Sequence, residues 1–510
     1  MATPLRYTLS ALCCTAMLLV YLPLFSAAGF LRPALIPENW RLLFEDPQFS
    51  QALSATLISS LIAVGGALAL TLLIIAALWP SAGWQRLTAR LPLLLALPHV
   101  AFATGALLLF AEGGVIYRIL PHLHAIPDRY GIGLGLVLAV KESAFLLWVS
   151  WAVLGEKRLS EQLLVLRSLG YGRGQCLRYL ILPVLLPALG IALLATTAWT
   201  LSVVDVAIIL GPGNPPTLAV LAWQWLNQGD ESTQIKGQLA CVMLLAILAV
   251  LALTACLLWV TARRFCPGLH GRRRPHASPL FGKVASLLIP LSGVACALTL
   301  LLLAHAALPD ALTFSNSFWL ALLAALLGAI LCLLWLEWGP SALTRCLWLP
   351  LILPALPLAA GQYEMALYGW MDGEFITVLW GHLLWVIPWM LFVLRPAWQR
   401  IDPRLVLIAR TLGWHQVRIF AQIKCPLIIK PLLSALAIGF SVSIAQYLPT
   451  QWLGAGRVPT LTTEAVALSS GGASAQLAAQ GLWQLILPVC FFSLMALMAQ
   501  LIGHYRRGLR

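Results

Sequence analysis

Twelve apolar runs of about 20 residues each constrain the fold of this chain more than any other feature of its sequence. A helix of that length crosses the hydrocarbon core of a bilayer. Only 10% of the residues are charged, whereas a soluble domain carries roughly 25%, so the chain cannot cover a water-facing surface. We therefore expect an all-α integral membrane protein with about 12 transmembrane helices. The runs lie near residues 8–29, 53–78, 92–111, 133–154, 184–206, 237–261, 284–306, 317–338, 348–369, 376–394, 431–450 and 482–503.

The basic residues are concentrated in every second loop. If the N-terminus is cytoplasmic, 25 of the 32 Lys and Arg residues fall on the cytoplasmic side, as the positive-inside rule requires. We therefore expect both termini in the cytoplasm. The net charge of +14 then reflects topology and the lipid bilayer, and not a nucleic-acid partner. The first run precedes eleven others, so we expect an uncleaved anchor and not a cleaved signal peptide.

The second half of the chain repeats the first, and over some fifty residues the match holds a constant offset of 243 residues. In both halves a glycine in a basic segment is followed by a proline thirteen positions later. The matched residues of these segments are Arg167, Leu169, Gly170 and Pro183 in the first half and Arg410, Leu412, Gly413 and Pro426 in the second. Two outer loops match at the same offset, through Gly211, Gly213 and Pro216 and through Gly454, Gly456 and Pro459.

Each half contains six runs, so we expect two homologous six-helix halves with the same orientation in the membrane. They occupy residues 1–261 and 284–510, and a basic linker rich in Pro and Gly separates them at 262–283. Within the third run, Pro98 echoes Pro357 of the ninth run.

The two basic segments, at about 155–183 and 395–430, are called the coupling segments below. Each has the spacing of a short amphipathic helix, and the predicted apolar stripe of the first is Leu159, Leu163, Leu166 and Leu169. We expect the glycine to end this helix in a left-handed conformation and the proline to begin a new segment after a bend. Such a helix can lie in a groove of a partner protein or on the membrane interface, and its repetition favours a partner.

The coupling segments resemble the EAA loop, Glu-Ala-Ala-x-x-x-Gly with a distal Ile-x-Leu-Pro, of permease subunits in bacterial binding-protein-dependent ABC importers. The glycine and the proline match, whereas Leu164 and Leu407 occupy the glutamate position. The two-half organisation most resembles the fused ferric-iron and thiamine permeases. The resemblance implies a multi-pass protein of the bacterial inner membrane that docks two copies of a cytoplasmic ABC ATPase and receives solute from a periplasmic substrate-binding protein.

The chain contains no Gly-x-x-x-x-Gly-Lys-Ser/Thr loop, so ATP must be bound and hydrolysed by a partner ATPase. We therefore expect a transport subunit without enzymatic activity and without a bound cofactor. The 11 cysteines show no spacing that suits zinc, so no metal site is predicted.

Ionisable and polar residues inside predicted spans are candidates for the translocation pathway, because burying them in a membrane is costly. Bonding to neighbouring spans is the alternative. These candidates are Lys141, Glu142, Asp205, His382 and Gln446, whereas Glu337 and Glu364 lie near span ends, where snorkelling or local pairing suffices. The two outer loops are candidate contacts for a binding protein, although their Gly and Pro residues also fix turns.

Two other classes of membrane protein are alternatives to an importer permease. A twelve-span secondary transporter driven by an ion gradient also has two six-span halves, but the loop after the second run lacks the Gly-x-x-x-Asp-Arg-x-Gly-Arg pattern typical of the major facilitators. A polytopic enzyme needs clustered carboxylates or a metal site, and the 18 acidic residues are dispersed. The sequence does not identify the substrate.

Overall fold

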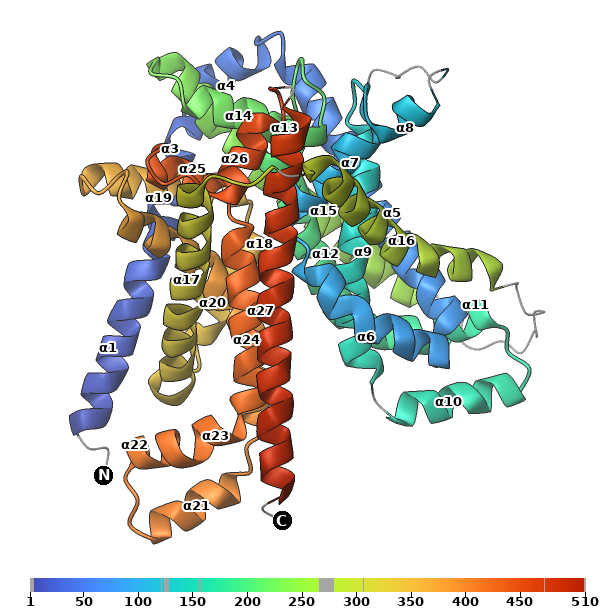
Figure 1. Ribbon diagram of the computed structural model, residues 1–510, viewed down its shortest axis with the longest axis vertical. Coiled ribbons are helices and arrows are strands. Elements are labelled where there is room, and N and C mark those ends of the chain that lie inside the picture. The colour runs from blue at the N-terminus through green and yellow to red at the C-terminus, as the bar shows by residue number, and fades with distance from the viewer. Residues whose placement is uncertain are drawn as a thin grey trace.

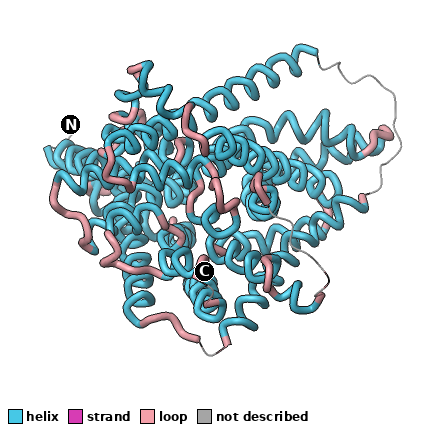
Figure 2. Tube along the Cα trace, turned by 90° about the horizontal axis from the view of Figure 1, so that it is seen from above, coloured by secondary structure: helices cyan, strands magenta, loops and turns pink. Residues whose placement is uncertain are grey.

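The computed structural model describes residues 4–120, 122, 128–155, 157–265, 279–305, 307–471 and 473–508. Over these residues the chain forms helices and loops and no strand (Figure 2). Most of the predicted linker, residues 266–278, lies outside the described ranges.

Ten helical segments of the described chain are long and apolar enough to span a membrane, and two bent helix pairs raise the number to 12. This confirms the predicted all-α membrane architecture. In the first half the long helices are α1 (Pro4–Tyr21), α5 (Phe49–Leu78), α7 (His99–Phe110), α9 (Ile132–Leu154), α12 (Leu182–Ser202) and α15 (Glu231–Phe265). In the second half they are α16 (Leu280–Ala304), α17 (Ala311–Trp338), α19 (Ala355–Tyr368), α20 (Phe375–Gln399), α24 (Ile429–Ile444) and α27 (Ser474–Gly508).

Shorter helices connect the spans. Those of the first half are α2 (Pro23–Ala28), α3 (Leu31–Ala34), α4 (Pro37–Phe44), α6 (Ala82–Ala96), α8 (Val115–Ile119), α10 (Lys157–Ser168), α11 (Arg173–Cys176), the π-helix η1 (Leu177–Ile181), α13 (Asp205–Leu210) and α14 (Leu218–Leu226). Those of the second half are the 3₁₀-helix η2 (Leu343–Trp348), α18 (Leu349–Ile352), α21 (Pro403–Thr411), α22 (Gln416–Ile419), the π-helix η3 (Phe420–Lys424), α23 (Cys425–Leu427), α25 (Leu448–Gly454) and α26 (Leu461–Leu468).

The helices of the two coupling segments lie at one end of the molecule. Figure 1 shows α10 and α21 at the end where α1 begins and α27 finishes, with α4, α13 and α14 at the opposite end. The latter end is called the outer end below. The described parts of both chain ends therefore lie on the same side as the coupling segments.

The predicted third run of each half is broken near its start. α6 ends at Ala96 and α7 begins at His99, and in the second half the break lies between α18 and α19. The second-half parts are inclined by 108°. A Leu-Pro pair makes each break, because a residue before proline disfavours the helical conformation. The continuous runs predicted at 92–111 and 348–369 were wrong in this respect, and the structural match of Pro98 is Pro354, not Pro357.

The first span of each half packs against the other half. α1 contacts α17 and α20, and α2 contacts α19. In return, α16 lies against α5 and α7 of the first half while also contacting α27. The sequence boundaries at 261 and 284 therefore do not separate two independent packing units.

The repeat is also visible in matched hydrogen bonds at the outer end. The backbone N–H that opens α14, at Leu218, donates to Thr56 Oγ1 at 2.7 Å, and the one that opens α26, at Leu461, donates to Ser317 Oγ at 2.8 Å. The first N–H groups of a helix have no partner within it, so both hydroxyls satisfy otherwise orphaned donors. The ends of the two outer Gly- and Pro-rich loops are thus anchored to α5 and α17.

Candidate functional site

Both coupling segments contain the same helix ending. Gly170 and Gly413 have φ of 86° and 80°, the left-handed conformation that glycine adopts most easily. Around Gly170, its N–H donates to Arg167 O at 2.9 Å and Tyr171 N–H donates to Leu166 O at 3.1 Å. The corresponding bonds around Gly413 are 3.0 Å each, from Gly413 to Arg410 and from Trp414 to Ala409. This pair of bonds is the Schellman motif, so the predicted role of the glycines as helix stops is confirmed.

The side chains that α10 presents outward differ from the predicted stripe. Leu159 and Leu163 are buried against the protein body, whereas Leu164, Val165 and Leu169 are exposed. The predicted stripe is therefore wrong as an outward face at Leu159 and Leu163 but not at Leu169, because the spacing reveals an apolar face without revealing which side the protein covers.

The second coupling segment exposes the matching residues, Leu407, Ile408 and Leu412. Leu164 and Leu407, at the position of the family glutamate, are 65% and 62% exposed. We call these two sets of three residues the coupling triads.

The prolines of the coupling segments lie after the π-helices. Pro183 is the second residue of α12 and Pro426 is the second residue of α23. Proline lacks an N–H, and just before each one the backbone switches to an i→i−5 bond, from Leu182 to Leu177 and from Cys425 to Phe420.

The predicted bend at the proline is wrong in the first segment, because this switch keeps the helix continuous from Arg173 to Ser202. In the second segment a 78° bend occurs two residues after Pro426, at Ile428.

A buried carboxylate anchors the second coupling segment. Glu337, near the end of α17, binds Lys424 Nζ at 2.5 Å and accepts a hydrogen bond from Gln416 Nε2 at 2.9 Å. The Glu337 side chain is 2% exposed and that of Lys424 is 16% exposed. Lys424 also lies over the Trp398 ring, 5.1 Å from its centroid. Of the two explanations that the sequence offered for Glu337, snorkelling and local pairing, the structure shows pairing.

Lys141 and Glu142 contact the two sides of the helix break between α6 and α7. Lys141 Nζ donates to Leu94 O at 2.8 Å, near the end of α6, where the last four carbonyls have no partner within the helix. Glu142 Oε1 lies 2.7 Å from Nε2 of His99, the first residue of α7. A cation at a helix C-terminus and an anion at a helix N-terminus are both favourable, so adjacent charges of α9 stabilise both helix ends.

His99 is a further functional candidate, absent from the predicted set. Its ring also lies 4.2 Å, centroid to centroid, from that of Trp199. The signal was present, because His99 is an ionisable residue inside a predicted span and directly follows Pro98.

The other three pathway candidates lie near the outer ends of the fifth spans. Asp205 begins the separate helix α13 and interacts electrostatically with His99 and with Tyr447. His382 is buried, with Nδ1 2.7 Å from Ser443 Oγ and Nε2 2.8 Å from Thr450 Oγ1. This arrangement is the bonding to neighbours that we considered as the alternative. Gln446 is half-buried in the break between α24 and α25.

The two halves meet at the helix breaks. Ser441 Oγ of the second half donates to Ala96 O, at the first break, over 3.1 Å. Reciprocally, Ala355 N–H at the second break donates to Ser202 Oγ of the first half over 2.9 Å. Each fifth span thus supplies a hydroxyl to the broken third span of the other half.

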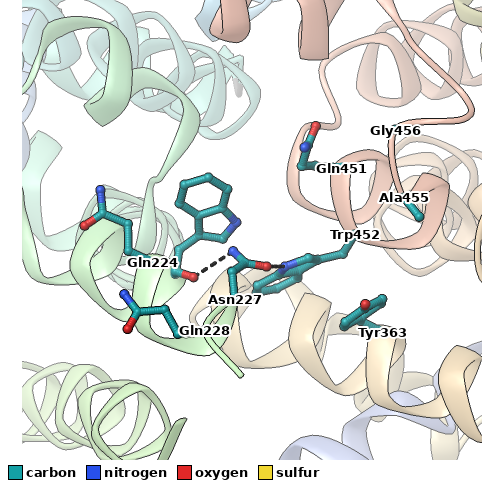
Figure 3. Close-up of a pocket in the computed structure, with 9 residues that line it drawn as sticks. Gln224, Asn227, Gln228, Tyr363, Gln451, Trp452, Ala455 and Gly456 are labelled. Atoms are coloured by element: carbon teal, nitrogen blue, oxygen red, sulfur yellow. Dashed lines mark hydrogen bonds between the residues drawn. The ribbon is translucent and has the colours of Figure 1, made fainter. Parts of the chain in front are cut away.

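Towards the coupling end, aromatic rings close the space between α9 and α20. The centroids of Phe145 and Trp389 are 5.5 Å apart, and those of Trp148 and Phe392 are 5.2 Å apart. At the outer end the halves instead enclose a pocket of about 580 Å³ (Figure 3). The interface is therefore closed by aromatic contacts near α10 and α21 and hollow at the opposite end.

The outer loops are only partly available to a partner. Gly213 and Gly456 are exposed and Gly211 and Pro459 are half-buried, whereas Pro216 and Gly454 are buried. In this structure neighbouring residues cover the last two.

Comparison with known proteins gives relatives in the ABC transporter permeases. The chain is 57% identical over 511 residues to the inner membrane ABC transporter permease protein YnjC of Escherichia coli (strain K12), with 100% of both chains covered. It is 29% identical over 97 residues to the spermidine/putrescine transport system permease protein PotC homolog of Mycoplasma genitalium, covering 19% of this chain and 34% of the relative. No family model matches the chain, and no solved structure matches it significantly.

Proposed function

Because this chain belongs to the inner membrane ABC transporter permeases, we propose that each of its coupling segments docks one copy of a cytoplasmic ABC ATPase. The chain is the permease component of an ATP-driven importer. Its relatives among the ABC transporter permeases favour this class over the ion-driven secondary transporter. Its two halves form the pathway, and a periplasmic substrate-binding protein delivers the solute to the outer end. Both termini then lie in the cytoplasm.

The observation that carries the docking proposal is the pair of coupling triads. Each triad exposes three large apolar side chains beside an identical Schellman motif, and both lie at one end of the molecule (Figure 1). Exposed apolar clusters at defined positions mark interaction surfaces. Leu164 and Leu407 replace the family glutamate, so apolar burial supplies the contact that the carboxylate would otherwise make.

The interface between the halves supports alternating access. Aromatic contacts close the pathway near the coupling segments, and the outer pocket leaves it hollow at the other end. α9 leads into α10 and α20 leads into α21, so movement of a docked ATPase acts directly on the helices that carry these rings. Separation of Phe145 from Trp389 is the step that opens the inner side.

The outer face offers two rigid loop tips to a binding protein. Gly213 and Gly456 are exposed, and the ends of their loops are held by Thr56 and Ser317. Anchored tips lose little conformational freedom on docking, which favours binding.

The docking proposal is tested with Leu164→Asp and Leu407→Asp, separately and combined, in nanodiscs with the partner ATPase. Full burial of a leucine stabilises an interface by about 1.5–3 kcal/mol, so each substitution weakens its own site at least about tenfold. Binding is measured by surface plasmon resonance, and ATP-driven uptake is measured in proteoliposomes. The double variant should lose both.

The matched control is Leu343→Asp, which changes an equally exposed leucine of η2 outside both triads. It should leave binding and uptake unchanged. Normal ATPase binding by the double variant would refute docking through the triads.

A further inference from the structure

The outer pocket lies between the two halves of the chain. Its first wall is α14, with Trp223, Gln224, Asn227 and Gln228, and its second wall comes from α19 and α25 (Figure 3). Aromatic rings and side-chain amides line it, and no charged residue is among the described lining residues.

Among the rings of the pocket, Trp452 has its indole N–H already bonded, whereas the Trp223 Nε1 has no hydrogen-bond partner within the described part of the chain. Tyr363 and Trp452 are stacked, with centroids 6.2 Å apart and an interplanar angle of 13°. Trp452 Nε1 donates to Asn227 Oδ1 at 2.8 Å, and Asn227 Nδ2 donates to Trp223 O at 2.8 Å (Figure 3). The indole donor of Trp452 is therefore unavailable to an anion, whereas the faces of aromatic rings attract cations.

A series of interacting side chains connects a lining residue of this pocket with Asp205 and Glu142. The Trp223 ring is 6.4 Å from that of Tyr447, which interacts electrostatically with Asp205. Asp205 in turn interacts with His99, and His99 is bound to Glu142. The nearby cation of Lys141 is held by a backbone carbonyl. This series of interactions, which starts at a lining residue of the pocket, therefore contains two carboxylates.

We propose that the outer pocket is an entry subsite for an organic cation, such as an alkylammonium or polyamine, which then moves towards Asp205. The subsite rests on the proposed importer function and specifies its substrate class. The rings hold the cation by cation–π attraction, and the amide oxygens accept its N–H groups. An anion would find no lysine or arginine among the described lining residues.

The test uses the full chain in nanodiscs without an ATPase. Equilibrium dialysis measures the binding of tetramethylammonium, spermidine and, as the neutral comparison, glucose. Gln228 is exposed at the pocket, so its side chain can be changed without disturbing packing. A charge placed there lies within several ångströms of a bound cation, so Gln228→Lys should weaken cation binding about fivefold or more and Gln228→Glu should strengthen it.

The matched control is Gln476→Lys, which adds the same charge at an exposed glutamine outside the pocket. Saturable cation binding that responds to Gln228 but not to Gln476 supports the subsite. The proposal is overturned if neither cation binds saturably, if glucose binds as tightly, or if the two lysine variants behave alike. ATPase docking is measured separately, after the partner ATPase is added to the same nanodiscs. Intact docking without cation binding would refute the subsite but not the permease function.

Discussion

The Glu337–Lys424 pair should make the second coupling segment rely on a buried charge. Glu337→Gln keeps the side-chain volume and removes the negative charge, which leaves the Lys424 ammonium without its counter-ion. Breaking a fully buried ion pair costs about 3–5 kcal/mol. Because Lys424 is 16% exposed and keeps its contact with Trp398, we expect about 2–3 kcal/mol here.

Amide hydrogen exchange measures this loss locally. A cost of about 2–3 kcal/mol corresponds to roughly 30- to 150-fold faster exchange of the η3 amides, if they exchange through local opening. The amides of η1 are the internal control, because η1 occupies the matching position in the first half, whereas Glu337 binds Gln416 and Lys424 of the second. Glu337→Gln combined with Lys424→Met should recover part of the protection, because no unpaired charge remains. Equal acceleration in η1 and η3, or none in either, would refute the reasoning.

Three further predictions concern helix ends, and all are read from thermal unfolding of the purified protein. Lys141→Met removes the donor to a buried carbonyl at the end of α6 and should cost about 1–3 kcal/mol. Gly413→Ala meets no atom within 4 Å but forces alanine to φ of 80°, which costs about 1–2 kcal/mol. Gly174→Ala, in a helix and equally unobstructed, should be neutral or stabilising. Thr56→Val orphans the Leu218 N–H at similar shape and should cost about 1–3 kcal/mol.

Each of these has an outcome that contradicts it. A melting temperature unchanged by Lys141→Met would mean that burying the ammonium costs as much as its hydrogen bond contributes. Equal destabilisation by the alanine variants at positions 413 and 174 would show that φ is not the cause. An unchanged melting temperature for Thr56→Val would show that the Thr56 hydroxyl does not stabilise the start of α14.

The sequence predicted the membrane architecture and the glycine helix stops because both depend on local physics. Apolar runs of spanning length have few alternatives, and a glycine after an amphipathic helix commonly ends it. The repeat directed attention to Gly170 and Gly413, whose backbone geometry agrees.

What could not be predicted depends on contacts between distant segments. The spacing of Leu159 and Leu163 gave an apolar face, but its burial depends on the packed body. Lys141 and Glu142 were recognised as costly inside a span, yet their partners lie more than forty residues away in sequence, at Leu94 and His99. No local sequence signal shows that α1 and α16 pack against the opposite halves, because a lipid-facing helix has the same composition whichever half it contacts.

The central claim is that one chain presents two equivalent docking sites for the ATPase. Native mass spectrometry of the nanodisc complex measures the stoichiometry directly. We expect two ATPase subunits on the unaltered chain, one on either Leu164→Asp or Leu407→Asp, and none on the double variant. Two ATPase subunits retained on the double variant, or one on the unaltered chain, would contradict the account.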